Sequence, residues 1–334
     1  MIGRGGVFSG LRTLMLQSIP LGTKCPFTNN QTLGGWLESG TFLVLASTRQ
    51  SITLQANPSD YAVVKLNEVE HLLNHALEHI QELTWYFRAP VGRSESWMAI
   101  TTYYLGFFAA SAILRLIGRP NVFLAKDRLA GLRGMTGGAQ FPGAGSFEFT
   151  VGNTLSATSA EVRLTVAAKS HEATWKSVLS LLNTLRADKS MIFAAGEADF
   201  YDSLCSKAFC ANGIGFDWPS DIRNKVNYRP GHSYRLSSPS FHVSNFLAPW
   251  RSVSAEEVFK IVNVAYRRCN AEKHSLACQV EMMTNISIVL YLIARSLYRE
   301  LEDRRMTDKR WENQRSVYKR NRGLHDPDFE YLCS

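Results

Sequence analysis

The sequence predicts a mainly α fold with a small β component, and three observations lead to that prediction. Apolar residues recur at three- and four-residue spacing over residues 66–87, which places them on one face of a helix. Residues 97–117 are apolar on nearly every face, as expected for the central helix of a bundle. Short stretches that alternate apolar and polar residues, at 146–151 and 161–167, are typical of strands.

The first 60 residues are rich in Gly, Ser, Thr and Pro, with two short β-like runs at 41–46 and 51–56. They predict a loop-rich N-terminal extension that contains a small strand pair. After the helix at 66–87, side chains from Ser94 to Ser96 are suited to cap the helix at 97–117.

Residues 127–145 are rich in glycine but contain neither GxxxxGK[ST] nor GxGxxG, so we expect a mobile linker rather than a phosphate-binding loop. The two alternating runs then predict a β-hairpin inserted into the helical domain at about 146–167. Helices are expected to resume at 172–185 and 197–209.

Towards the C-terminus, Ser220 or Asp221 is suited to cap a helix beginning near Ile222, which Pro230-Gly231 would end. A capping box at Ser254–Glu257 predicts a helix over 255–268, and a long apolar helix follows over 276–301. The predicted organisation is therefore an extension (1–60), a helical domain with its β insertion (61–301) and a basic tail (302–334).

Composition narrows the range of partners and compartments. A formal net charge of +8 and a pI of about 9.2 favour nucleic acid or another acidic surface as a partner. The six cysteines are scattered with no CxxC pair, which argues against a zinc ribbon and a disulfide scaffold and favours the cytoplasm. The apolar window at 98–118 contains Thr, Ser and Arg, so we expect a buried helix and no membrane span.

A dense polar run from Asp221 to His232 is the most informative segment for function. Besides these two residues it holds Arg223, Asn224, Lys225, Asn227, Tyr228 and Arg229. An arginine to stabilise phosphate charge, amides to orient it and a histidine or tyrosine to move a proton are what RNA cleavage without a metal needs.

Two segments together resemble the HEPN superfamily of bacterial toxins, CRISPR-associated ribonucleases and abortive-infection proteins. Residues 96–118 resemble its long apolar helix with an aromatic pair and a closing glycine, and Arg223-Asn224 resembles the opening of its Arg-to-His motif. The chain departs from the motif because Tyr228 stands where the family's histidine falls, and His232 lies beyond the usual spacing.

The resemblance implies a HEPN-like helical bundle and a cytoplasmic bacterial antiviral-defence or toxin-like protein that acts on RNA. It implies a metal-independent endoribonuclease without a cofactor, in a homodimer or with a partner protein of a defence operon. The candidate catalytic residues are Arg223, Asn224, Tyr228 and His232. The alternative is a catalytically inactive HEPN-like adaptor, a structural subunit of a multi-protein defence complex.

Each candidate residue also has an ordinary structural interpretation. Arg223 would pair with Asp217 or Asp221 at a helix start, and Tyr228 would be a core or interface tyrosine because a phenol is a poor base at neutral pH. His232 has suitable proton chemistry, but it follows Pro230-Gly231, which leaves its direction undetermined.

The basic segments predict nucleic-acid contacts, because cations neutralise phosphates and aromatic rings stack on unpaired bases. The candidates are Lys225, Arg229, Arg304, Arg305, Lys309, Arg310, Trp311 and Arg315. A solvated helix with alternating charges explains the tail equally well. A plain nucleic-acid-binding module is therefore a third hypothesis.

Three histidines, His71, His75 and His79, recur every four residues along the helix at 66–87. Two histidines at this spacing can share a metal ion. The polar face of a solvated helix is the simpler interpretation, and we expect no metal.

Overall fold

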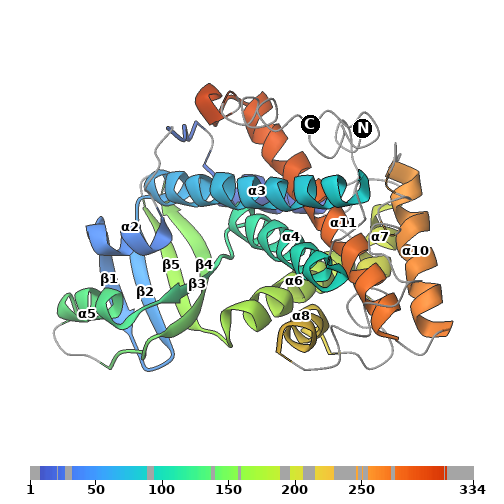
Figure 1. Cartoon of the computed structure of the whole chain (residues 1–334). Coiled ribbons are helices and arrows are strands. Elements are labelled where there is room, and N and C mark those ends of the chain that lie inside the picture. Colours follow the sequence, from blue (N-terminus) through green and yellow to red (C-terminus); the bar gives the residue numbers. More distant parts are fainter. Residues whose placement is uncertain are drawn as a thin grey trace.

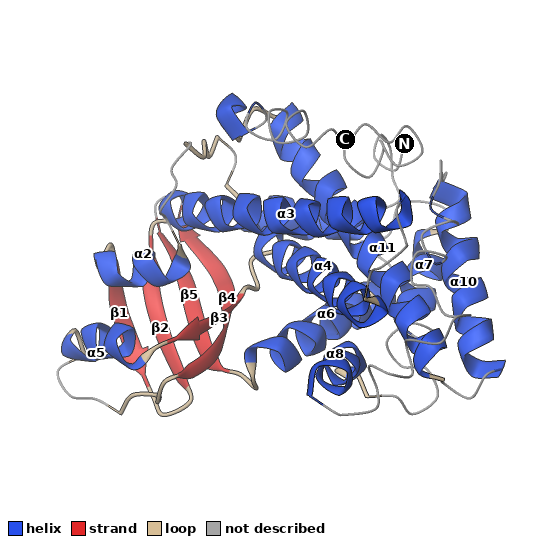
Figure 2. Cartoon of the chain, in the orientation of Figure 1, coloured by secondary structure: helices blue, strands red, loops and turns tan. Residues whose placement is uncertain are grey.

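The computed structural model describes residues 8–20, 22–26, 32–88, 94–136, 140–156, 159–188, 196–205, 215–228, 246, 250, 255–271, 275–311 and 313. These residues are mainly helical, with one five-stranded antiparallel sheet. The sheet lies at one end of the molecule and most of the helices lie at the other (Figures 1 and 2).

The sheet has the strand order β1-β2-β5-β4-β3, every neighbouring pair being antiparallel. Its strands are β1 (Phe42–Ser47), β2 (Ser51–Ala56), β3 (Asn121–Leu124), β4 (Gly145–Ser156) and β5 (Ser159–Val166). The hairpin and the N-terminal strand pair are both confirmed, but they are not separate units. They form one sheet because β2 pairs with β5, with Leu54 opposite Val162.

One face of the sheet carries its own hydrophobic cluster. Inward-facing residues such as Leu54 and Phe149 pack with residues of α2 (Leu33–Ser39) and α5 (Lys126–Gly134). The helix α5 falls where we expected a linker, so that expectation is wrong for residues 127–134. Leu129 and Leu132 are buried in this cluster. Their burial outweighs the penalty of about 1 kcal/mol for each glycine in a helix.

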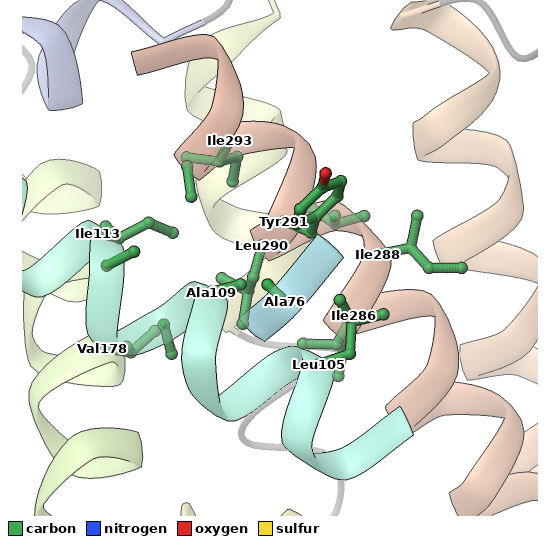
Figure 3. Packing of buried hydrophobic residues seen from close by; sticks show 14 of the residues in the cluster. Ala76, Leu105, Ala109, Ile113, Val178, Ile286, Ile288, Leu290, Tyr291 and Ile293 are labelled. Carbon is green, nitrogen blue, oxygen red and sulfur yellow. The ribbon is translucent and has the colours of Figure 1, made fainter. Parts of the chain in front are cut away.

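The second and larger cluster is the helical bundle. Its main helices are α3 (Pro58–Arg88), α4 (Glu95–Leu116) and α11 (Leu276–Asp303). The predicted central helix is confirmed, since α4 packs against both α3 and α11. Figure 3 shows apolar side chains gathered where α4 and α11 cross, among them Leu105 and Ile286.

The approach of α4 to α11 depends on a glycine. A Cβ atom built on Gly106 would overlap Ser287 Oγ and lie 3.0 Å from the Cβ of Ser287 and 3.3 Å from its Cα. Only a residue without a side chain allows the two backbones to come this close.

Around these helices lie α1 (Ser9–Ser18), α6 (Ser170–Ala187), α7 (Glu197–Asp202), α8 (Trp218–Tyr228) and α10 (Ala255–Ala271). The predicted helix near Ile222 begins earlier, at Trp218, with Pro219 in its first turn, where the missing N–H is harmless. Ser220 and Asp221 therefore lie inside the helix and do not cap it. Ser254 and Pro230-Gly231 lie outside the described residues.

Two of the helices, α4 and α11, are long and apolar enough to cross a membrane by length and composition. Inside the protein, 78% and 72% of their most apolar windows are buried. This burial is the pattern of core helices, and it accounts for their apolar composition.

The helix α3 belongs to both clusters. Its Tyr61 and Val64 pack into the sheet cluster, whereas Ala62 and Leu66 pack into the bundle. Between them Lys65 is fully buried, and its Nζ donates a hydrogen bond to the Ser18 carbonyl at 2.9 Å. Burial lowers the pKa of this ammonium group to about 7.

Candidate functional site

Arg223, on α8, lies against the aromatic face of α4. Its Nη2 donates a hydrogen bond to Tyr104 Oη at 3.1 Å, and its Nη1 donates to Asn224 Oδ1 at 2.7 Å. The guanidinium carbon lies 5.7 Å from the centre of the Tyr103 ring and 5.8 Å from that of Tyr104. Cation–π attraction and two hydrogen bonds therefore hold this half-buried cation in place.

The ion pair that would have given Arg223 a purely structural role is not formed. Asp221 pairs instead with Lys225, one turn along the same helix. Among the described residues, no carboxylate lies within ion-pairing distance of the Arg223 guanidinium, and its buried Nε has no hydrogen-bond partner. Its positive charge and several of its N–H donors are therefore left for another group.

His171, on α6, is held at the same aromatic face. Its ring stacks on Phe107 with centroids 4.3 Å apart, and its Nδ1 is 2.7 Å from Tyr103 Oη. Burial, and then the positive charge of Arg223, lower the pKa of His171 below its ordinary value of 6.5. The imidazole is therefore neutral at neutral pH, which is the form that accepts a proton.

The hydroxyl of Tyr103 links this histidine to α8, because it also lies 3.2 Å from Ser220 Oγ. When Tyr103 donates its proton to Ser220, its oxygen accepts the N–H of His171 Nδ1. In that tautomer, Nε2 of His171 carries the free lone pair. The arrangement is one that orients a general base through a second hydrogen-bonding group.

The histidines of α3 contact aromatic rings. His75 lies 5.1 Å from Phe108, His79 lies 5.6 Å from the same ring, and His71 meets Trp311 edge-on at 5.6 Å. Burial lowers the pKa of His79 to about 4. Within the described part of the chain, no group of three potential ligands is placed to hold a metal ion. The face carries aromatic stacking, where we had expected only solvated side chains.

Of the predicted catalytic residues, Arg223 and Asn224 lie together. Tyr228 is 71% exposed at the end of α8, so its ring is not a core residue of this chain. His232 and Arg229 lie outside the described residues. His171 and Tyr103 were missed because the signal that marks them is three-dimensional, and no short motif joins them to Arg223.

In the part of the basic tail that the structure describes, some cations pair with carboxylates and others are exposed. Arg304 pairs with Glu300 at 2.8 Å, whereas Arg305 and Lys309 are exposed. Arg310 likewise pairs with a carboxylate, at 2.7 Å. Trp311 is only 1% exposed and contacts His71, so its ring does not present a face to an unpaired base. Arg315 lies outside the described residues.

A scan of protein-family models, a search of curated proteins and a search of solved structures find no match to this chain. The chemistry of the site itself is an arginine with no carboxylate partner among the described residues, next to a neutral histidine, on an aromatic face.

Proposed function

We propose that this chain is a metal-independent endoribonuclease of the bacterial antiviral-defence or toxin type, built on a HEPN-like helical bundle. The observation that carries the proposal is the pairing of Arg223 with a neutral His171 across the Tyr103 ring. The resemblance of the α4 and α8 segments to HEPN proteins and the net charge of +8 support it.

In the proposed reaction, Nε2 of His171 takes the proton of an RNA 2′-hydroxyl, whose oxygen attacks the adjacent phosphorus. The Arg223 guanidinium, whose charge no carboxylate of the described residues neutralises, stabilises the charge that gathers on the phosphoryl oxygens. The bond to the 5′-oxygen breaks, and that oxygen takes a proton from the Tyr104 hydroxyl, which Arg223 already contacts. The products are a 2′,3′-cyclic phosphate and a 5′-hydroxyl.

The aromatic face explains how such a site would select RNA. Phe107, Phe108 and Tyr104 lie beside the proposed reacting groups, and aromatic rings stack on unpaired bases of any sequence. We therefore propose single-stranded or looped RNA as the substrate class. His232, which lies outside the described residues, is the alternative to Tyr104 as the donor of the proton to the 5′-oxygen, and assembly as a homodimer is a further prediction.

The test is cleavage of labelled single-stranded RNA in excess EDTA, with products analysed for 2′,3′-cyclic phosphate. Replacing the base in His171→Gln, or the cation in Arg223→Gln, is expected to slow cleavage at least about 100-fold. Arg186→Gln is the matched control, because this arginine pairs with Asp202 on the surface, on the same helix as His171. Equal rates in wild type, His171→Gln and Arg223→Gln would rule this mechanism out.

A second candidate, a catalytically inactive HEPN-like adaptor in a cytoplasmic defence complex, is favoured by exposed aromatic side chains. Trp85 and Trp97 are 50% and 53% exposed near the adjoining ends of α3 and α4, and Tyr228 is more exposed still. Tryptophan and tyrosine are enriched at protein–protein interfaces. Light scattering with size-exclusion chromatography, alone and with proteins encoded by neighbouring genes, tests this candidate. A monomer that binds none of those proteins would count against it.

A further inference from the structure

A basic pocket lies far from Arg223, where the C-terminal end of α11 meets the N-terminal loop. Its volume is about 370 Å³, within the range of small-molecule sites. The lining residues are Gly22, Thr23, Lys24, Arg304, Arg305 and Met306. A backbone hydrogen bond from Cys25 N–H to the Met306 carbonyl, at 2.8 Å, joins the two sides.

The charges of the lining residues are all positive. Lys24 and Arg305 have no ion-pair partner among the residues that the structure describes. Arg304 is the exception, since it pairs with Glu300, which Arg12 also contacts at 2.7 Å. Two residues whose cations have no ion-pair partner in the described part of the chain, and a third whose cation is partly neutralised, therefore line the same pocket, which favours an anion there.

Arg305 occupies a position that usually belongs to glycine. Its φ is 57°, and within the described residues it is the one non-glycine residue with positive φ. Its N–H donates to the Glu302 carbonyl at 2.8 Å, and Met306 N–H donates to the Leu301 carbonyl at 2.9 Å. These two bonds form the Schellman motif that ends α11.

Glycine is the preferred residue at this position of a Schellman motif, because a Cβ atom strains a backbone in the left-handed conformation. The chain keeps an arginine there instead, and this residue lines the pocket. A strained residue at a pocket is a reason to look for a ligand. The same two hydrogen bonds occupy carbonyls at the end of α11, which would otherwise repel an anion.

The buried hydroxyl of Thr23 gives an independent indication. Thr23 lines the pocket and is only 4% exposed, yet its Oγ1 has no hydrogen-bond partner among the described residues. Buried hydroxyls in folded proteins nearly always have a partner. A bound anion that accepted this O–H would supply one.

We propose that this pocket binds a phosphomonoester group, held by Lys24, Arg305 and Arg304 and by a hydrogen bond from Thr23. A monoester carries nearly two negative charges at neutral pH and three acceptor oxygens, which matches the converging cations better than a singly charged diester. Its source is either a free nucleotide or the 5′-end of an RNA strand. The proposal does not depend on cleavage at Arg223.

The test uses four probes with the full-length protein: inorganic phosphate, AMP, a 5′-phosphorylated RNA and the same RNA with a 5′-hydroxyl. Calorimetry and ligand-induced change in melting temperature are the readouts. Arg305→Gly is expected to weaken phosphate binding about tenfold while the free protein melts at the same or a higher temperature. Lys24→Gln is expected to weaken binding similarly, and Thr23→Val less.

Lys309→Gln is the matched control, because it removes an exposed cation from the same segment without changing the pocket lining. Stronger binding of AMP identifies a free nucleotide as the source, and stronger binding of the 5′-phosphorylated RNA than of its 5′-hydroxyl form identifies an RNA end. Failure of all four probes to bind, or equal binding by wild type, Arg305→Gly and Lys24→Gln, would overturn the proposal. Arg223→Gln keeps the pocket intact, so binding without cleavage separates this proposal from the nuclease.

Discussion

Replacing Lys65 with methionine is expected to change how the stability of the protein depends on pH. The ammonium group is fully buried on α3 and forms no ion pair with a carboxylate of the described residues. Burial lowers its pKa to about 7. Its contacts are the Ser18 carbonyl at 2.9 Å and the Tyr61 ring at 5.0 Å. Methionine is similar in length and cannot titrate.

The expected magnitude follows from the difference between the folded and unfolded pKa. An unfolded lysine keeps its proton up to a pKa of about 10.4, whereas the folded protein releases it near pH 7. The unfolded chain binds more protons between these values, so stability rises with pH there. Below about pH 6 the buried Lys65 is fully protonated, so the cost of burying its charge destabilises the folded protein in full. Raising the pH from about 5.5 to 8.5 relieves about 2 kcal/mol of it.

The assay is urea unfolding of wild type and Lys65→Met at these two pH values. The difference in unfolding free energy between the two proteins cancels the groups that titrate in both. The unfolding free energy of Lys65→Met is expected to exceed that of the wild type by the largest amount at the lower pH. At the higher pH this difference is expected to be smaller by about 2 kcal/mol. An advantage that is the same at both values would show that Lys65 does not titrate in this window, and the reasoning from burial would be refuted.

Three further predictions concern packing, proton transfer and a buried carboxylate. Gly106→Ala is expected to destabilise by about 1–3 kcal/mol in thermal unfolding, because its methyl group would strike Ser287, whereas Gly131→Ala, with open space around it, is expected to be neutral or stabilising. The rate of RNA cleavage by the wild type is expected to fall with decreasing pH, because protonated His171 cannot act as a base. The midpoint is expected below 6.5, since the pKa of His171 is lowered from that value. A midpoint above 6.5 would exclude His171 as the base. Glu197→Gln is expected to lower the unfolding free energy by about 1.5–3 kcal/mol, and with it the melting temperature, because the buried carboxylate accepts hydrogen bonds from the start of α1. An unchanged melting temperature would contradict that role.

The sequence predicts well those elements whose signal is local. The helices α3, α4 and α11 carry their apolar pattern within their own residues, and Ser94 caps α4 through the Trp97 N–H as expected. The pairing of β2 with β5 joins segments more than a hundred residues apart, so no local pattern reveals it. Likewise α5 forms because Leu129 and Leu132 are buried by other elements.

The candidate site likewise contains one residue that the sequence identifies and others that only the folded structure reveals. Arg223 was identified because its chemistry and its place in a polar run are both visible along the chain. His171 stands alone in a helix, and only the folded arrangement brings it to Tyr103. The apolar pattern of α4 predicts only a central helix, whereas in the structure Tyr104 also accepts a hydrogen bond from the arginine.

The helix α3 joins the two halves of the molecule mechanically. Because different faces of the first turns of this one helix pack into the sheet cluster and into the bundle cluster, neither half can unfold without removing packing that the other half needs. A disturbance at the strands should therefore register at the distant helices within a single cooperative transition, and calorimetry of the intact chain would record one peak.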